Sequence, residues 1–348
     1  MPRTLLAADP ETAVVVVEMG MRGTGQIAAL CDFVRPDWGV VTNVGESHIE
    51  LLGSRENIAR AKAELYAALP AGVGRAFLNL GSPFLESLLE AGRLRERPVP
   101  LVGFEGRPDA TVCELLERDE TLCESVVWAE DVMLDAEGRP RFTLCARDHA
   151  DREEASLFPT VERCPCALAL TGAHNVDNAV AAASVGYALG LDLETIAGAL
   201  GASVPEPGRQ EVIAARAGFT IVNDAYNASP DSMRASLSTF AATDVAGRRI
   251  AVLGDMGELG DFAEPCHRGV GAHAAAMGLD RLICVGDLAA FIAEGARDAG
   301  MDDARIGRAA TVADVLEELD TLLEPGDAVL VKASHFMGLT RVVEGLVN

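Results

Sequence analysis

The chain has 348 residues, of which 49% are apolar and only 5% aromatic, and its formal net charge is −24. This length is enough for two ordinary domains with a large, mostly aliphatic core. The acidic balance argues against a nucleic-acid binder, which would carry a basic face. It permits an anionic nucleotide, because a nucleotide site needs only a few local cations and backbone amides.

The cysteine pattern and the apolar runs indicate a soluble cytoplasmic protein. Eight cysteines are spaced singly, apart from Cys164 and Cys166, and no Cys-x-x-Cys pair occurs. Thiols in a reducing compartment explain this spacing better than a metal cluster does. The opening Met1-Pro2-Arg3 is unlike a signal peptide. No apolar run approaches the ~18 residues of a membrane-spanning helix.

The first 45 residues predict two strands around a helix. Pro2–Leu6 closes a helix or a loop, and Ala13–Met19 is an apolar run typical of a buried strand. An apolar helix then passes through Ile27 and stops at Pro36, before a short second strand at Val40–Val44. A strand, a helix and a parallel strand form a right-handed crossover unit.

Polar side chains follow both predicted strands. Ser54 has the position of an N-cap, and the helix that it begins carries Lys62. Glu18, Asn43 and His48 fall at or just beyond the carboxyl ends of the two strands, where ligands gather in parallel sheets. The pattern therefore predicts a carboxylate, an imidazole and an amine at one edge of a sheet.

Lysine is almost absent from the chain. Lys62 and Lys332 are the only lysines, so 29 − 2 = 27 of the basic residues are arginine. A lysine can lose its proton and react with carbon dioxide or a carbonyl group, whereas arginine stays charged. The two lysines are therefore candidates for a chemical role; chance survival is the alternative.

The part of the chain from residue 75 to residue 165 predicts fewer elements. Strands are expected at Arg75–Leu80, Val99–Phe104 and Arg141–Cys145, and a hairpin turn at Asp135–Gly138. The sequence indicates little else here. An Ala-rich helix then runs through Asn178 to its C-cap, Gly190, and a shorter helix follows at 193–200.

A Pro- and Gly-containing linker at Gly201–Gly208 divides the chain into predicted domains at 1–204 and 205–348. Beyond it, strands and helices alternate, which predicts a second parallel α/β domain of the Rossmann-like kind. The stretch Ser229-Pro230-Asp231 combines an N-cap, a first-turn proline and an acid at a helix start. The strands are expected at Phe219–Val222, Ile250–Leu253, Leu282–Val285 and Ala328–Val331, and the helices at 230–241, 264–277, 288–299, 312–323 and 336–346.

The order of several motifs resembles that of the Mur ligases, the ATP-dependent amino-acid ligases of peptidoglycan synthesis. These motifs are Glu18-Met19-Gly20, Thr42-Asn43-Val44 to His48, Ala61-Lys62-Ala63-Glu64, Gly172-Ala173-His174-Asn175-Val176-Asp177-Asn178, Gly208-Arg209 and Asn223-Asp224-Ala225-Tyr226-Asn227-Ala228-Ser229-Pro230. Leu253–Gly260 and Leu330–Ser334 are similar to the branch of the family that adds D-alanyl-D-alanine to UDP-N-acetylmuramoyl-tripeptide. Each motif is weak alone, but their ordered combination is specific.

The resemblance implies the fold, the reaction and the role of each candidate residue. The fold would be an α/β central domain of Mur type, incomplete at its N-terminus, and a Rossmann-like C-terminal domain. The reaction would use ATP and Mg²⁺ to activate a carboxylate as an acyl phosphate, which an amine then attacks. The positions that match metal-site residues of the family are Glu18, His48 and Lys62, of which Lys62 matches a carbamylated lysine, and those that match catalytic residues are Lys62, His48 and Arg209. The positions that match nucleotide-binding residues are Asn175, Asn178, Arg209, Asp224, Tyr226 and Asn227. Lys332 matches a substrate-binding residue.

The chain departs from the family in one respect. Mur ligases carry an N-terminal substrate domain and a Gly-Lys-Thr phosphate loop, whereas no Gly-Lys pair occurs here. We therefore expect this chain alone to be inactive, with an N-terminal segment missing from it. Two alternatives are a non-catalytic Mur-like remnant or interaction protein, and a ligase of the folylpolyglutamate or cyanophycin type. The motif from Asp255 to Gly260 argues against the second alternative.

Most candidate residues also have a purely structural interpretation. Glu18 could cap the following helix, and Arg209 could be an ordinary surface arginine. Lys332 could be a surface lysine at a strand end. His267 and His273 fall on one predicted helix and are expected to be surface residues.

Overall fold

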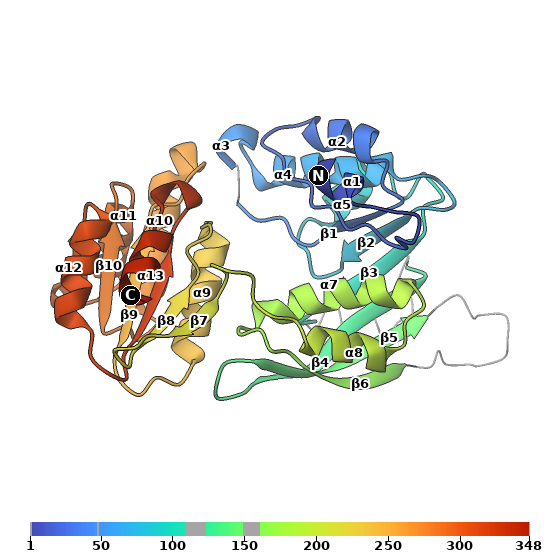
Figure 1. Cartoon of the computed structure of the whole chain (residues 1–348). Helices are drawn as coiled ribbons and strands as arrows, with labels where there is room; N and C mark the ends of the chain where they lie inside the picture. The colour runs from blue at the N-terminus through green and yellow to red at the C-terminus, as the bar shows by residue number, and fades with distance from the viewer. Residues whose placement is uncertain (1, 47–48, 109–122, 149–160, 348) are drawn as a thin grey trace. The chain divides into compact units, whose positions relative to one another are not determined.

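The computed structural model describes residues 2–46, 49–108, 123–148 and 161–347. These residues form two six-stranded sheets, each with its own helices (Figure 1). The chain divides into two compact units, Met1–Glu130 with Leu144–Cys164 and Asp177–Ile196, and Asp131–Thr143 with Pro165–Val176 and Ala197–Asn348.

The strands of the first sheet follow one another in chain order, β1-β2-β3-β4-β5-β6. β1 to β4 are parallel neighbours; Val40 pairs with Phe77, and Phe77 with Val102. A tight turn joins β4 to β5, as the sequence predicts. Within this turn the Gly138 amide donates a hydrogen bond to the Asp135 carbonyl. The strands are β1 (Trp38–Val41), β2 (Arg75–Asn79), β3 (Leu101–Glu105), β4 (Ser125–Leu134), β5 (Pro140–Asp148) and β6 (Glu162–Ala167).

Helix α4 (Arg55–Ala68) is the predicted helix after the Ser54 N-cap, whose side chain accepts the Asn57 amide. It contacts α2, α3, α5 and β1. Its fully buried Tyr66 accepts the Val41 amide and donates to the Phe77 carbonyl, which ties the helix to β1 and β2. The other helices in this half of the chain are α1 (Pro2–Leu6), α2 (Gln26–Val34), α3 (Ile49–Leu52), α5 (Leu85–Ala91), α7 (His174–Ala188) and α8 (Leu193–Gly201).

The first predicted strand was wrong. Ala13–Met19 has no regular secondary structure and pairs with no described strand, and Val16 is 82% exposed. A run of valines has high strand propensity, but a strand is stable only against a neighbouring strand. The second predicted strand lies two to three residues earlier than expected, at Trp38–Val41. The patterns also missed β4, β6, β7 and β11, which are short or only partly apolar.

The second sheet has the order β11-β10-β9-β12-β8-β7. All neighbours are parallel except β7 and β8, which form an antiparallel pair. β12 is the last strand in sequence, yet it lies between β8 and β9. The strands are β7 (Glu211–Ala214), β8 (Thr220–Asn223), β9 (Arg249–Gly254), β10 (Arg281–Val285), β11 (Ile306–Ala309) and β12 (Ala328–Lys332).

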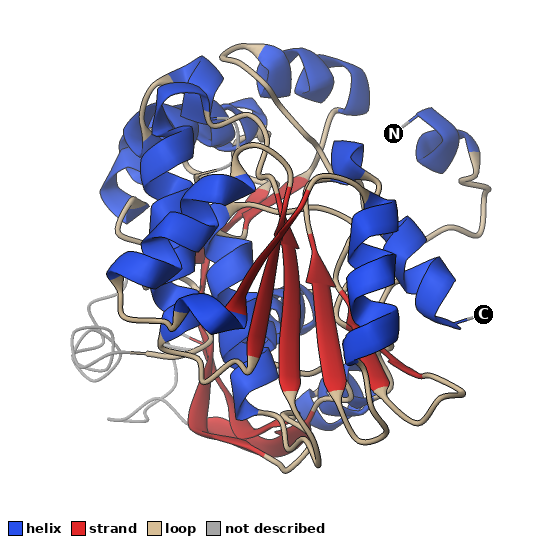
Figure 2. Ribbon diagram, turned by 90° about the vertical axis from the view of Figure 1, so that its left-hand side faces the viewer, coloured by secondary structure: helices blue, strands red, loops and turns tan. Residues whose placement is uncertain are grey.

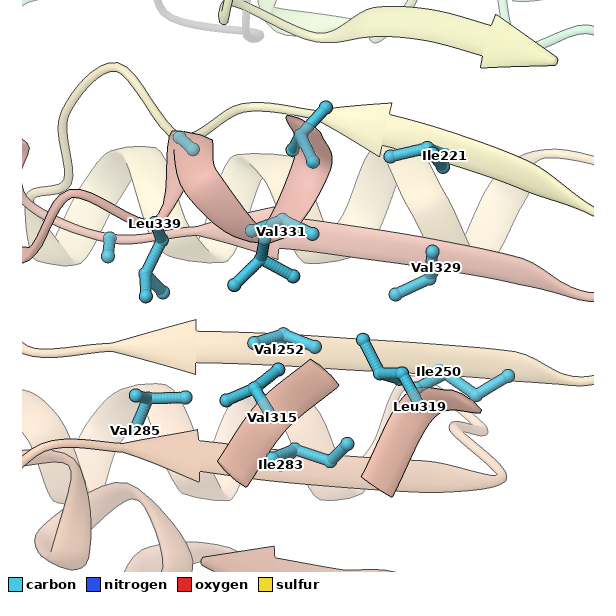
Figure 3. Close-up of a cluster of buried hydrophobic side chains, with 14 of the residues drawn as sticks. Ile221, Ile250, Val252, Ile283, Val285, Val315, Leu319, Val329, Val331 and Leu339 are labelled. Carbon is cyan, nitrogen blue, oxygen red and sulfur yellow. The ribbon is translucent and has the colours of Figure 1, made fainter. Parts of the chain in front are cut away.

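Helices lie on both sides of the second sheet (Figure 2). Alternate strand residues such as Ile250, Val329 and Val331 pack beneath α12 and α13 with Val315 and Leu319 (Figure 3). The predicted α/β class with parallel sheets is confirmed; the boundary at 204/205 stays a prediction. None of the described helices is long and apolar enough to cross a membrane. The helices here are α9 (Pro230–Ala242), α10 (Ala263–Ala275), α11 (Ala289–Asp298), α12 (Val312–Leu322) and α13 (Thr340–Val347).

Glycine permits the close packing of α10 on α11, which yields a stability prediction. A Cβ at Gly271 would lie 2.0 Å from the Ile292 carbonyl oxygen, whereas a Cβ at Gly269 would meet nothing within 4 Å. We expect Gly271→Ala to lower the free energy of unfolding by about 1–3 kcal/mol because the helices must separate. Gly269→Ala, the matched control, should raise it by up to about 1 kcal/mol through helix propensity. Urea unfolding of both variants measures this, and equal midpoints would contradict the packing argument.

Candidate functional site

Three polar loops meet at the carboxyl edge of the second sheet. They follow the neighbouring strands β8, β12 and β9, whose apolar residues are almost all buried. The loop after β8 ends at Ser229, which begins α9 with a capping box: its side chain accepts the Ser232 amide, and the Ser232 hydroxyl accepts the Ser229 amide. Strand ends and a helix start thus give this loop fixed ends.

A buried ion pair connects the loops after β8 and β12. Lys332 Nζ donates to Asp224 Oδ2 at 2.7 Å and to the Asn227 carbonyl at 3.0 Å, and Lys332 is only 3% exposed. Burial lowers the pKa of Lys332, and the Asp224 carboxylate opposes this effect. The interpretation of Lys332 as a surface lysine was therefore wrong: the end of β12 lies between two other strands, so its side chain is enclosed.

Arg209 lies on a turn that is held against the loop after β8. The Gly208 carbonyl accepts the Tyr226 amide at 3.1 Å, and the Gln210 amide donates to Asp224 Oδ1 at 3.3 Å. Both residues beside Arg209 have a left-handed backbone, with φ of 75° at Gly208 and 53° at Gln210. The exposed guanidinium stacks on the Tyr226 ring, with Cζ 4.3 Å from the ring centroid. The site thus presents a cation from a fixed backbone position.

The loop after β9 is held by a buried histidine. His267 Nε2 accepts the Met256 amide at 2.9 Å, so the ring is neutral and Nδ1 donates to the Ala263 carbonyl at 2.6 Å. Burial lowers the pKa of His267. The prediction that His267 is a surface residue was wrong, since its side chain is fully buried. The Gly257 amide donates to Ser334 Oγ at 2.9 Å, which joins this loop to the end of β12.

Lys62 lies in a different environment, on helix α4, which contacts β1 of the first sheet. Its Nζ donates to the Asn43 carbonyl at 2.7 Å, just beyond β1. Lys62 thus lies near the end of that strand, where the sequence places it. The neighbouring Ala61 is fully buried and Lys62 is half-buried. Burial lowers the pKa of Lys62, which increases the fraction of neutral amine.

The other predicted metal residues are less well defined. Glu18 is exposed on the irregular segment before α2, and His48 lies outside the described residues. Within the described part of the chain, no three His, Cys, Asp or Glu side chains converge as a metal site. An amine is a poor ligand for Mg²⁺, which prefers oxygen, so Lys62 fits a magnesium site only as a carbamate.

The predicted adenine-side residues lie in the first turns of α7. Asn175 Nδ2 donates to the Thr171 carbonyl at 2.7 Å, which is a structural role at the helix start; Asn178 lies one turn further.

Of the predicted site residues, the structure brings Arg209, Asp224, Tyr226, Asn227 and Lys332 together at one sheet edge.

Three further residues support this edge, although the sequence did not predict them as site residues. They are Gln210, Ser334 and His267. Gln210 Nε2 donates to Asp224 Oδ2 at 3.1 Å and to Ser236 Oγ at 2.8 Å. Ser334 lies three positions beyond the last residue of the predicted strand Ala328–Val331 and ends a family motif, so its place in the site could have been predicted from sequence; the buried position of His267 could not.

Comparisons with known proteins agree with this architecture. The family model "Mur ligase middle domain" matches residues 1–186, and "Mur ligase, glutamate ligase domain" matches residues 208–335. The UDP-N-acetylmuramoyl-tripeptide--D-alanyl-D-alanine ligase of Mycobacterium tuberculosis is 36% identical over 99% of this chain and 65% of its own length. That of Bacillus subtilis is 34% identical over 100% of the chain and 67% of its own length.

Solved structures give the same result. MurF from Acinetobacter baumannii has a TM-score of 0.79 at 26% identity, covering 99% of this chain and 67% of that one. MurF of Thermotoga maritima in complex with ADP has a TM-score of 0.68 at 23% identity, covering 93% of this chain and 64% of that one.

The fold and the matched regions define an α/β protein with two mainly parallel sheets, built from a middle and a C-terminal Mur ligase domain. The chain belongs to the Mur ligase family, which confirms the resemblance found in its motifs. It spans about two-thirds of the length of these relatives.

The neutral His267 predicts a specific loss of stability in acid. Because the folded pKa is below the ordinary value of about 6.5, the unfolded chain binds a proton first. The stabilisation is complete above about pH 6.5 and is lost as the pH falls, by up to about 1.4 kcal/mol per pH unit. In His267→Gln the free energy of unfolding should fall less steeply between pH 7 and pH 5.

The control for this prediction is His273→Gln. His273 lies on the same helix, is half-buried and contacts the Ser238 hydroxyl through Nε2. This variant should keep the wild-type slope in denaturant titrations at several pH values. A wild-type slope in His267→Gln as well would exclude His267 as the titrating group.

Proposed function

We propose that this chain supplies the ATP-binding and C-terminal parts of a ligase that joins D-alanyl-D-alanine to UDP-N-acetylmuramoyl-tripeptide. Two relatives that carry this printed name are 36% and 34% identical over nearly the whole chain. The observation that carries the proposal is Arg209, stacked on Tyr226 beside the buried Asp224–Lys332 pair, at a sheet edge where ligands bind. The singly spaced thiols fit a cytoplasmic site for this reaction.

In this proposal the tripeptide carboxylate attacks the γ-phosphorus of ATP, and ADP leaves. The amine of D-alanyl-D-alanine then attacks the acyl phosphate carbon, loses a proton and expels phosphate, which forms the new amide. Arg209 would offset the charge that develops on the transferred phosphoryl group, since its backbone is already fixed. Asp224, Tyr226 and Asn227 would face the nucleotide, with Asn175 and Asn178 on the adenine side.

Magnesium, when bound, would offset charge on the phosphates. Glu18, His48 and the carbamate of Lys62 would hold it. Among the described residues, the contact that supports this set is the Lys62 hydrogen bond to the Asn43 carbonyl, combined with the lowered pKa of Lys62. A neutral amine is the form that reacts with carbon dioxide, and the reaction converts a cation into an oxygen ligand.

A second candidate function is non-catalytic. One observation favours it: the 348 residues contain no Gly-Lys pair of the kind that cradles nucleotide phosphates. These 348 residues on their own keep the predicted adenine-side residues and Arg209 but contain no phosphate loop. They would therefore bind nucleotide weakly and would not catalyse the ligation.

Calorimetry with Mg-ATP tests the nucleotide site. We expect a dissociation constant weaker than about 1 µM, or about −8 kcal/mol. Arg209→Ala should weaken binding further because a fixed cation is lost. The matched control is Arg216→Ala, an exposed arginine in the turn before β8, at the opposite end of that strand; it should bind like the wild type. Sub-micromolar binding would contradict the expected weak affinity, and equal effects of the two substitutions would contradict the proposed role of Arg209 at the nucleotide site.

The carbamate of Lys62 can be detected directly. In ¹³C-bicarbonate buffer the protein should show a carbamate signal that Lys62→Arg removes. The signal should grow as the pH rises from 6 to 8.5, because only the neutral amine reacts. The absence of a signal at pH 8.5, or its survival in Lys62→Arg, would show that Lys62 is not carbamylated.

A further inference from the structure

The loop from Asp224 to Ser229 has hydrogen-bonded backbone groups along its whole length. This loop carries the exposed Tyr226 and Asn227, so its conformation decides what the sheet edge presents. Its contacts are Asp224 N to Val331 O (3.0 Å), Tyr226 N to Gly208 O (3.1 Å), Lys332 Nζ to Asn227 O (3.0 Å), Ser334 Oγ to Ala228 O (3.3 Å) and Ser229 N to Ser232 Oγ (2.9 Å).

Lys332 is the one side chain in this set that holds two points of the loop. Its ammonium bonds the Asp224 carboxylate at the start of the loop and the Asn227 carbonyl three residues later. Two of its three N–H donors are therefore used within the protein. Because Lys332 is 3% exposed, it offers almost no surface to a ligand.

Asp224 extends this control to Arg209. Its carboxylate accepts the Gln210 amide and the Gln210 Nε2 group, and Gln210 keeps a left-handed backbone with φ of 53°. Such a backbone is unfavourable for a residue other than glycine and persists only where contacts impose it. Release of Asp224 would therefore also release the turn that orients Arg209 over Tyr226.

We propose that Lys332 is a positioning residue that fixes the Asp224–Asn227 loop, and through Asp224 and Gln210 the Arg209–Tyr226 stack, without touching the substrate. The proposal replaces the direct substrate contact expected from the sequence. That the fixed loop serves a nucleotide rests on the proposed function. The positioning itself rests only on contacts within the C-terminal domain.

Fluorine NMR of the full chain tests the positioning without any ligand. The chain has three tyrosines, so 3-fluorotyrosine labelling gives three resonances, which Tyr226→Phe assigns. In Lys332→Met the Tyr226 resonance should shift beyond its linewidth, while Tyr66 and Tyr187 keep theirs. An unchanged Tyr226 resonance in Lys332→Met would overturn the proposal and favour a direct substrate contact.

A matched control lies at the other end of β12. Arg248 pairs with Asp327, a 3% exposed carboxylate directly before the strand, at 2.7 Å. Arg248→Met also leaves a buried carboxylate without its partner cation, but it should not move the Tyr226 resonance. An equal shift in this control would mean that Tyr226 reports only general destabilisation, and the proposal would fail.

Asp224→Asn provides a second route if Lys332→Met does not fold. This variant keeps the shape of the side chain but removes the charge that holds Lys332, so the Tyr226 resonance should again shift. If it does not shift, Lys332 does not act through Asp224 and the proposal is wrong.

Titration with Mg-ADP separates this proposal from the proposed function. Mg-ADP should move the wild-type Tyr226 resonance, and Lys332→Met should weaken that binding roughly tenfold, as loss of a supporting residue commonly does. No response of the wild type at millimolar Mg-ADP would count against the nucleotide function alone, because the ligand-free shift is independent of it. Wild-type affinity in Lys332→Met would count against the positioning role.

Discussion

The carboxyl edge of the second sheet depends on the buried pair of Lys332 and Asp224. A buried charge is costly unless it is paired and its remaining hydrogen-bonding capacity is used. Here the pairing is complete and most of that capacity is used: the ammonium has a carboxylate and a carbonyl for two of its three donors, and the carboxylate has the ammonium and both nitrogens of Gln210. Loss of either partner leaves the other charged and enclosed, so the loop geometry is coupled to the integrity of the pair.

The strand order explains why this pair exists only in the complete domain. Lys332 and Asp224 are 108 positions apart in the chain, and they meet because β12 inserts between β8 and β9. The contact therefore depends on the assembled sheet and not on local chain structure. Ser334 then joins the loops of the two neighbouring strands through Ala228 and Gly257.

The sequence was most informative where a local rule determines local structure. The N-caps Ser54 and Ser229 and the alternating strands of the C-terminal half predicted their elements well, because capping and periodicity act within a few residues. The strand predicted at Ala13–Met19 was wrong because a strand is stable only beside a neighbouring strand. The site residues of the family motifs could be named, but the burial of His267 and the left-handed Gln210 could not, since long-range packing determines both.

The two lysines show why a chain that otherwise uses arginine keeps these positions. Burial lowers the pKa of both, but Lys332 faces a carboxylate that favours the charged form. Lys62 bonds only a carbonyl among its described hydrogen-bond partners, and nothing there opposes the effect of burial on its pKa. The first site therefore holds a compact ammonium between two acceptors, and the second increases the fraction of neutral amine. A guanidinium differs in shape from the compact ammonium at the first and cannot lose its proton at the second, so arginine is not equivalent to lysine at either site.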